Sequence, residues 1–443
     1  MIELDTIVAP ATPPGRSALA IVRIDGPLST SILESLSQGA LPPARTAALT
    51  HLHEPPTANC QPPTPIDECI AIRYEAPHSF TGNDLVELTL HGNPLLVERV
   101  MEACVSLGAR MAEPGEFTER AVLNGKLDLV QAESIADLIN ARTTLQAKLS
   151  LSNLEGMLSR KASAIRQTLL EVISRLEAAL DFSEEGYEFI TRDEARSRIE
   201  AALREIAVMS ETYRRGRATR AGLSAVILGR PNAGKSTLLN RLVGSDRAIV
   251  TPIPGTTRDI VRETIEIGGL PVTLADTAGL RESADLVEGI GIERAREAAR
   301  SADIVLYLVD GVTGLADEDR SELTGLDNVQ IVYTKADLGP HEGLSISAVS
   351  DHGIYELLSR LDELVRDRYA APEGALVNER QRVAVAECDA AMQAALEATD
   401  TGLDEQMIVA DLYRATNALG VLTGAVTRED VLAEIFGKFC IGK

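Results

Sequence analysis

The chain has 443 residues, enough for roughly two to four domains of ordinary size. It holds 43 Lys and Arg against 66 Asp and Glu, a formal net charge of −23 at pH 7. This acidity disfavours nucleic-acid binding by bulk charge, because such binding depends on basic side chains neutralising phosphates, but it allows a local basic face. The 45% hydrophobic content excludes wholesale disorder.

The cysteines and the N-terminus argue against a secreted or membrane protein. The five cysteines are odd in number and form no C-x-x-C pair, so neither a disulfide framework nor a zinc site is indicated. The first residues lack the basic and apolar regions of a secretory signal, and no apolar run approaches the ~18 residues of a membrane span. We therefore expect a soluble, cytoplasmic protein with no membrane partner.

Residues 1–118 predict an N-terminal α+β domain. Aliphatic side chains dominate residues 18–24 and 85–90, which are predicted strands, and residues 94–107 form a predicted helix. Fourteen of the 20 prolines lie before residue 115, so long helices are disfavoured in this part of the chain.

Residues 119–217 and 378–443 predict long helices, because no proline interrupts either segment. Apolar residues of the first segment recur at helical spacing, at Leu169, Val172, Ile173, Leu176 and Leu180. We expect the two segments to pack together as one all-α domain.

Residues 218–377 lie between these segments and predict an inserted domain. Short apolar strands alternate there with helical stretches, at 223–228, 271–275, 304–309 and 329–333. That alternation is typical of a doubly wound sheet, so the whole chain is predicted to be a multidomain α/β protein.

A phosphate-binding motif opens the inserted domain. Residues Gly229–Ser236 read G-R-P-N-A-G-K-S, which matches G-x-x-x-x-G-K-[ST] and stands between a predicted strand and a predicted helix. Glycines let the backbone wrap the phosphates, and the helix N-terminus adds partial positive charge. Lys235 is expected to reach the β- and γ-phosphates and Ser236 to bind Mg²⁺. The remaining contact candidates are Asn232, Ala233, Gly234 and Thr237.

Two further motifs favour GTP over ATP. Asp276 and Gly279 fit a D-x-x-G turn that follows a strand and faces metal and γ-phosphate. The sequence T-K-A-D resembles the guanine-reading N-K-x-D, with Thr in the place of Asn, and S-A-V resembles the S-A-K loop behind the base. The candidate base contacts are Thr334, Lys335, Asp337, Ser347 and Ala348. Whether Thr334 weakens GTP binding is left open.

The loop 251–259 carries a doubled Thr that can offer a hydroxyl to Mg²⁺ when GTP is bound. Leu280 stands where Ras-like proteins carry a water-orienting Gln, and Leu cannot position water. The nearest carboxylates are Glu282, Asp285 and Glu288.

These motifs resemble the TrmE–Era–EngA group of bacterial GTPases. Further blocks narrow the resemblance to the MnmE (TrmE) family of tRNA-modification GTPases, at residues 5–24, 78–94, 113–139 and 436–443. The resemblance implies that the N-terminal domain dimerises and binds a tetrahydrofolate one-carbon donor of the 5-formyl or 5,10-methylene type. It implies that, with the flavoprotein MnmG in a heterotetramer, GTP hydrolysis accompanies installation of an aminomethyl-type group on C5 of the wobble uridine of tRNA.

The resemblance also assigns ions to the GTPase domain. It places K⁺ near Asn232, with oxygens of Thr251, Ile253 and Thr256, where a cation offsets charge that develops on the phosphates. It places Mg²⁺ on Ser236 and Thr257. Glu288 matches the family's water-activating glutamate and supplies the function missing at Leu280.

For the folate, the resemblance points to Arg23, Glu87, Lys126 and Lys443. Cations suit the glutamate tail of a folate and a carboxylate suits the amines of its pterin. By the same resemblance Cys440 is a functional cysteine near the folate and tRNA chemistry. Without the resemblance, the four charged residues read as ordinary surface charges, and Cys440 reads as a small tail residue.

Two alternatives stay open on the sequence: a ribosome-assembly factor of the Era or EngA type, and a signalling switch without a folate pocket. No G-x-x-G loop with flanking basic residues is found for the first. Residues 119–217 carry 15 basic and 16 acidic groups, so they are nearly neutral in an acidic chain. If tRNA contacts the protein, and no DNA partner is expected, this segment and Lys443 are the predicted contact region.

Overall fold

A computed structural model describes residues 5–39, 41–55, 64–182, 189–245, 247–249, 262–276, 296–326, 328–339, 343–401, 404–426 and 429–442. By contacts the chain forms two compact units, residues 1–136 with 420–443 and residues 137–419. The predicted boundary at 118 falls inside helix α3 (Glu116–Leu123), and the one at 217 falls inside α8 (Tyr213–Ala221). Residues 119–136 and 420–443, predicted to be parts of the helical domain, therefore group with the N-terminal sheet.

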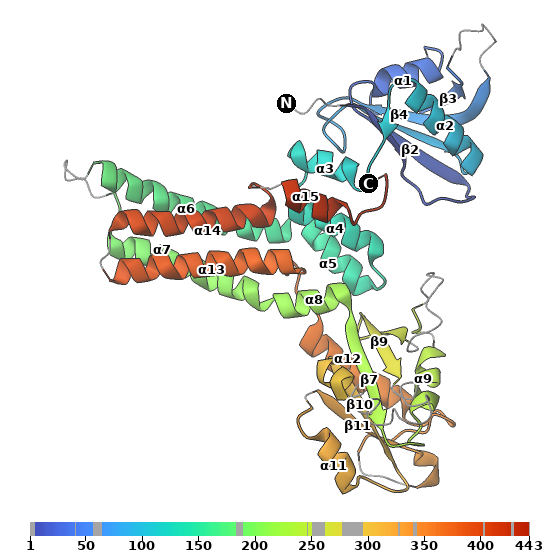
Figure 1. Ribbon diagram of the computed structural model, residues 1–443, viewed down its shortest axis with the longest axis vertical. Helices are drawn as coiled ribbons and strands as arrows, with labels where there is room; N and C mark the ends of the chain where they lie inside the picture. The colour runs from blue at the N-terminus through green and yellow to red at the C-terminus, as the bar shows by residue number, and fades with distance from the viewer. Residues whose placement is uncertain are drawn as a thin grey trace, which may run out of the picture. The chain divides into compact units, whose positions relative to one another are not determined.

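The first unit is built on the sheet drawn in shades of blue in Figure 1. Its six strands lie in the order β3-β4-β5-β2-β1-β6. Its strands are β1 (Ile7–Pro10), β2 (Leu19–Asp25), β3 (Ala48–His53), β4 (Pro65–Tyr74), β5 (Leu85–His91) and β6 (Arg110–Met111). Two of these, β2 and β5, confirm the strands predicted at 18–24 and 85–90. The neighbouring strands β1, β2, β5, β4 and β3 pair antiparallel, and β6 pairs parallel to β1.

The two faces of this sheet differ in what covers them. Helices α1 (Ser29–Leu36) and α2 (Pro94–Ser106) pack on one face over Val22, Val86 and Leu88. The opposite face carries a smaller core around Ile7, Ala9, Leu85 and Phe117 of α3. Asn93 caps α2 by accepting from the Leu95 amide, and Pro94 follows at the first turn, where proline is tolerated.

The C-terminal residues close the first unit. Helix α15 (Glu429–Phe436) contacts α3, and buried Phe436 packs with Leu129 and Ala132 of α4 (Leu129–Asn140). Burial of these apolar side chains holds α15 against α3 and α4 within the first unit. The last strand-like pairing joins Ile441 to Pro114.

The second unit contains the helical bundle and the inserted α/β domain. Figure 1 shows α6 (Met157–Asp181), α7 (Arg192–Glu211), α13 (Glu379–Asp400) and α14 (Glu405–Thr423) side by side. Arg166 of α6 donates to the Thr416 carbonyl of α14 at 3.3 Å, so the two sequence segments pack together as predicted. The apolar stripe of α6 is buried, apart from partly exposed Leu180.

The inserted domain has a five-stranded sheet in the order β11-β10-β7-β9-β8. The predicted strands are present as β7 (Leu223–Gly229), β9 (Leu270–Asp276), β10 (Ile304–Asp310) and β11 (Val329–Thr334), all parallel. The strand β8 (Arg262–Ile267) was not predicted; it pairs antiparallel to β9 at the edge. Helices α9 (Lys235–Val243) and α12 (Ile354–Tyr369) bury one face of the sheet.

Cys69, Cys104 and Cys388 are buried free thiols, and burial is the main cause that raises the pKa of each to about 12. Across the helices that the structure describes, none has the length and apolar content to cross a membrane.

Candidate functional site

The loop from Gly229 to Lys235 joins the central strand β7 to helix α9. Gly229 has φ +138°, and a Cβ there would lie 2.3 Å from the Leu308 carbonyl oxygen, so only glycine fits. Asn232 and Gly234 also have positive φ, at 65° and 87°. The backbone therefore curls tightly before the N-terminus of α9, which is where helix amides and the helix dipole favour an anion.

Lys235 is already held inside this loop. Its Nζ donates to the carbonyl oxygens of Gly229 at 2.9 Å and Arg230 at 2.7 Å, and the residue is buried. Ala233 is buried beneath the loop, whereas Asn232, Ser236 and Thr237 are exposed. The arrangement orients one cation and places oxygen-bearing side chains on the open side, as phosphate and metal binding require.

The predicted guanine-reading residues come together at the end of β11. The Ala336 amide donates to the Ile346 carbonyl at 3.1 Å, which joins the T-K-A-D and S-A-V segments. A hydrogen bond from Ser347 is the main cause that lowers the pKa of Asp337, an exposed residue in the 3₁₀ turn Ala336–Leu338. Asp337 is therefore ionised and able to accept from the N–H groups that guanine offers.

Lys335 has left-handed backbone, φ 60°, and its Nζ donates to Asp310 at 2.6 Å. This hydrogen bond is the main cause that lowers the pKa of Asp310. The lysine is thus anchored at the carboxyl end of β10, beside the end of β11, where doubly wound sheets bind their ligands.

Thr334 connects the base-reading segment to the phosphate loop. The residue is buried, and its hydroxyl donates to the Val309 carbonyl at 3.3 Å. Its Cγ2 lies 4.0 Å from where a Cβ on Gly234 would stand. A Thr at this position therefore fills space against the P-loop, although it lacks the amide of the usual Asn.

Several predicted residues lie outside the described part of the chain: Thr251, Ile253, Thr256, Thr257, Gly279, Glu288 and Lys443. The structure places Asp276 at the end of β9 but does not describe its side chain. These assignments stay predictions.

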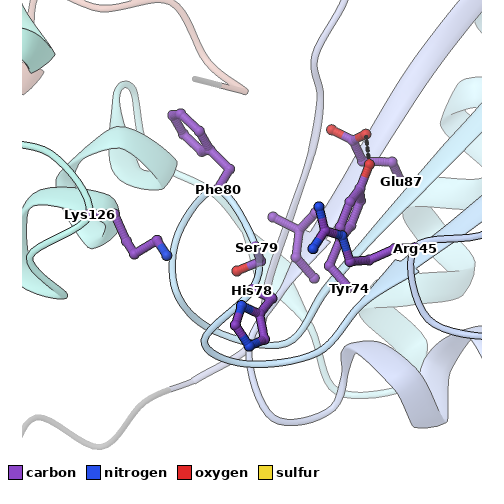
Figure 2. A pocket seen from close by; sticks show the side chains of 8 residues that line it. Arg45, Tyr74, His78, Ser79, Phe80, Glu87 and Lys126 are labelled. Atoms are coloured by element: carbon purple, nitrogen blue, oxygen red, sulfur yellow. Dashed lines mark hydrogen bonds between the residues drawn. The ribbon is translucent and has the colours of Figure 1, made fainter. Parts of the chain in front are cut away.

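The first unit holds a second candidate site, a cavity of about 420 Å³ on the sheet face that α3 shares (Figure 2). Its lining residues are Arg45, Tyr74, His78, Ser79, Phe80, Leu85, Glu87 and Lys126. Figure 2 shows Glu87 and Tyr74 joined by a hydrogen bond, with Arg45 close by and Lys126 across the loop that carries Phe80.

Two of the four predicted folate residues, Glu87 and Lys126, line this cavity, and a third, Arg23, is bound to Glu87. Arg23 and Glu87 face each other across β2 and β5, and Arg23 Nε donates to Glu87 Oε1 at 2.8 Å. Lys126 Nζ donates to the Pro77 carbonyl at 2.9 Å. The Tyr74 hydroxyl donates to the other Glu87 oxygen at 3.4 Å, and burial, followed by Glu87, raises the pKa of Tyr74.

Other lining residues were not predicted. Phe80 lies under the Arg23 guanidinium, 5.6 Å from ring centroid to Cζ, and with His78 and Ser79 it belongs to a block that carried the family resemblance. Because three lining residues fall within this one block, sequence reasoning could have predicted them from it. Arg45, in contrast, reaches the cavity from a loop with no motif, so only the fold places it there.

The loop that carries Ser79 and Phe80 is fixed by a buried carboxylate. Asp25 is fully buried and accepts from Arg120 Nη1 at 3.0 Å, from Asn83 Nδ2 at 3.0 Å and from the Thr81 hydroxyl. A buried charge is tolerated only when it is paired in this way. The pairing therefore holds the loop 79–83 against the sheet and α3.

The C-terminal tail reaches the same unit. Gly442 has φ 92°, and a Cβ there would lie 2.0 Å from the Pro10 carbonyl oxygen, so the tail backbone lies directly on the end of β1. The Gly115 amide donates to the carbonyl of Cys440, whose side chain is exposed. Pro10 follows Ala9, the register partner of Arg23, so the tail ends one strand away from the strand that carries Arg23.

Comparisons with known proteins assign the family. A profile described as MnmE helical domain matches residues 129–440, and one described as GTP-binding protein TrmE N-terminus matches residues 6–126. The tRNA modification GTPase MnmE of Koribacter versatilis is 42% identical over 99% of both chains. The chain belongs to the MnmE family.

Two other MnmE proteins show that the likeness runs along the whole chain. The one from Aquifex aeolicus is 38% identical over 99% of this chain and all of its own. The one from Paracoccus denitrificans is 41% identical, again over 99% of this chain and all of its own. The profile of the helical domain spans the nucleotide loop, and the profile of the N-terminus spans all eight residues that line the cavity.

Proposed function

We propose that this chain is a potassium-stimulated GTP hydrolase that, with the flavoprotein MnmG, installs an aminomethyl-type group on C5 of the wobble uridine of certain tRNAs in the cytoplasm. Family membership makes it a GTP-hydrolysing tRNA-modification enzyme, and the one-carbon unit comes from a tetrahydrofolate derivative. The observation that carries the proposal is that one chain holds both a nucleotide loop with its base-reading segment and a separate cationic cavity with a carboxylate.

The nucleotide half rests on the phosphate loop and on Asp337. The loop presents Asn232 and Ser236, exposed side chains with oxygen atoms that suit K⁺ and Mg²⁺. When bound, these ions supply positive charge against the charge that develops during phosphoryl transfer. Lys235 holds a third positive charge inside the loop, and Asp337 selects guanine over adenine.

The folate half rests on the chemistry of the cavity. Glu87 offers a carboxylate to pterin amines, and Phe80 offers a ring face for stacking, with 37% of its surface exposed. Arg45 and Lys126 are cations suited to the glutamate tail. The exposed thiol of Cys440 belongs to the same unit.

Self-association rests on the uncovered part of the same sheet face. Leu49 and Ile70 are register partners on β3 and β4, and they are 64% and 38% exposed. Ile70 lies two residues from Ile72, which faces Glu87, so these side chains continue the cavity face. Burying such apolar surface favours a homodimer through the N-terminal domain.

The tRNA contact rests on helix α8. This helix contains Arg214, Arg215, Arg217 and Arg220 and no acidic residue. Arg220 is paired with Asp137, whereas Arg214 and Arg217 are exposed. A local basic helix in an acidic chain predicts weak, salt-sensitive tRNA binding that MnmG assists.

The deciding experiment is wobble-uridine analysis of tRNA from cells that lack this protein, complemented with the wild-type or the Cys440→Ser gene. Restoration by the wild-type gene supports the proposal, and unmodified uridine in its presence contradicts it.

Purified protein should hydrolyse GTP faster in K⁺ than in Na⁺. Equal rates would contradict the K⁺ site at Asn232. Tight folate binding by the double variant Arg23→Ala/Lys126→Ala would contradict the folate assignment.

A further inference from the structure

Arg230 is the second residue of the phosphate loop, and carboxylates of α11 (Asp317–Leu323) hold its side chain. Its Nε donates to Asp319 Oδ1 at 2.9 Å, and its Nη2 lies 3.3 Å from Glu318 Oε2. The two partners differ in burial, because the side chain of Glu318 is 89% exposed and that of Asp319 only 2%. Charges screened by water interact weakly, so Asp319 is the partner that fixes Arg230.

Asp319 is itself fixed from two other directions. Its Oδ2 accepts from the Ala316 amide at 2.8 Å, and its Oδ1 also accepts from the Tyr307 hydroxyl at 2.9 Å. Tyr307 is fully buried in the middle of β10, and the same hydroxyl lies 2.9 Å from Glu322 Oε2. The carboxylate of Asp319 cannot move without breaking these bonds, and each unpaired buried group would be costly.

The backbone of Arg230 carries this restraint to Lys235. The Arg230 carbonyl oxygen accepts from Lys235 Nζ at 2.7 Å, beside the Gly229 carbonyl at 2.9 Å. We propose that Asp319 is a positioning residue for the nucleotide: through Arg230 it fixes the peptide on which the Lys235 ammonium rests. The inference rests on the proposed assignment of this loop to GTP and adds a residue that lies outside every nucleotide motif.

This geometry predicts an effect on nucleotide affinity rather than on the hydrolysis step. An ordered loop loses less conformational freedom when the phosphates bind, so releasing Arg230 weakens binding. Once the nucleotide is in place, the phosphates themselves hold the loop and Lys235. The turnover number at saturating GTP should therefore stay close to that of the wild type, while KM rises.

The test is a double-mutant cycle on GDP affinity in the full-length chain, with Arg230→Gln, Asp319→Asn and the double variant. We expect each single substitution to weaken GDP binding about tenfold, the size of one charge-assisted hydrogen bond. We expect the double variant to bind GDP as tightly as whichever single variant has the lower affinity, because both changes remove the same restraint. The matched control is Glu322→Gln, which disturbs the same Tyr307 hydroxyl and should change GDP affinity less than about twofold.

Additive losses in the cycle, or unchanged affinity with a lowered melting temperature, would overturn the inference. If Asp319→Asn does not fold, Arg230→Gln carries the test alone, since its side chain is one-third exposed, and wild-type affinity would overturn the inference. Lys235→Ala distinguishes a failure of this inference from a failure of the proposed nucleotide site. If Lys235→Ala loses GDP binding while Asp319→Asn keeps wild-type affinity, only this inference is refuted. If Lys235→Ala still binds GDP, the nucleotide site itself is refuted.

Discussion

The nucleotide loop and the N-terminal cavity assemble their binding groups in different ways. In the first, backbone carbonyls and one lysine lie within a single turn between β7 and α9, and the contact from Thr334 is added from β11. In the second, side chains come from β4, β5, the loop residues 78–80, Arg45 and Lys126, and the buried ion pair of Asp25 with Arg120 fixes the loop 79–83. The first site depends on backbone conformation and the second on tertiary pairing, so different substitutions should damage them.

Gly229→Ala should produce the largest effect, because it attacks the backbone of the nucleotide loop. The new Cβ would meet the Leu308 carbonyl at 2.3 Å in a strained backbone. We expect a loss of about 4 kcal/mol in unfolding free energy, together with loss of GDP binding. The control is Gly314→Ala, where φ is also positive but nothing lies within 4 Å. Equal melting temperatures for the two variants would contradict this account.

Arg120→Met tests the second site in the same way. It leaves the fully buried Asp25 without its cation, so we expect a loss of about 3 kcal/mol in unfolding free energy and weaker folate binding. GDP affinity should not change, because the nucleotide loop belongs to the other unit. Arg99→Met, which breaks an ion pair with half-exposed Glu54, is the control for a surface charge. Folate titration measures the affinity of each variant, and denaturant unfolding measures its stability. Unchanged folate affinity in Arg120→Met would contradict the proposed support of the loop.

Thr334→Asn tests whether the motif residue or the packing matters more at position 334, where Thr replaces the Asn of the N-K-x-D motif. An Asn restores an amide donor next to the loop, so we expect GTP affinity to rise about fivefold, the value of one neutral hydrogen bond. Thr334→Val serves as control, because it keeps the methyl contact with the loop and removes only the hydroxyl. A weaker affinity for Thr334→Asn would show that the Thr methyl is required.

Ser347→Ala should produce the smallest effect. The Ser347 hydroxyl lowers the pKa of Asp337, so Asp337 stays ionised, and able to bind guanine, as the pH falls through the ordinary range of a carboxyl group. Without that hydroxyl the pKa of Asp337 rises, and the loss of GDP affinity on acidification should begin at a higher pH. Ser345→Ala, which removes a bond to the Gly343 carbonyl, is the control. Superimposable pH profiles of GDP affinity would exclude this role for Ser347.

The sequence predicted the strands of the inserted domain well, because each is a short, continuous apolar run that is buried on both faces of a parallel sheet. It missed β8 at the edge of the sheet, whose sequence R-E-T-I-E-I has only two apolar residues, Ile265 and Ile267. It also divided the chain at 118, where α3 runs on without interruption. Helix boundaries and domain contacts depend on partners distant in sequence, which local patterns do not report.

The sequence by itself determined the nucleotide loop, since G-x-x-x-x-G-K-S fixes local backbone shape and puts its cation and hydroxyl at fixed spacing. Only the tertiary structure decided the rest. It brought Arg45 and Tyr74 beside Glu87, placed buried Asp25 under the cavity loop and set Asp319 behind Arg230. The physical reason is that a phosphate loop satisfies its hydrogen bonds among neighbours in sequence, whereas a buried charge must find its partner wherever the fold supplies one.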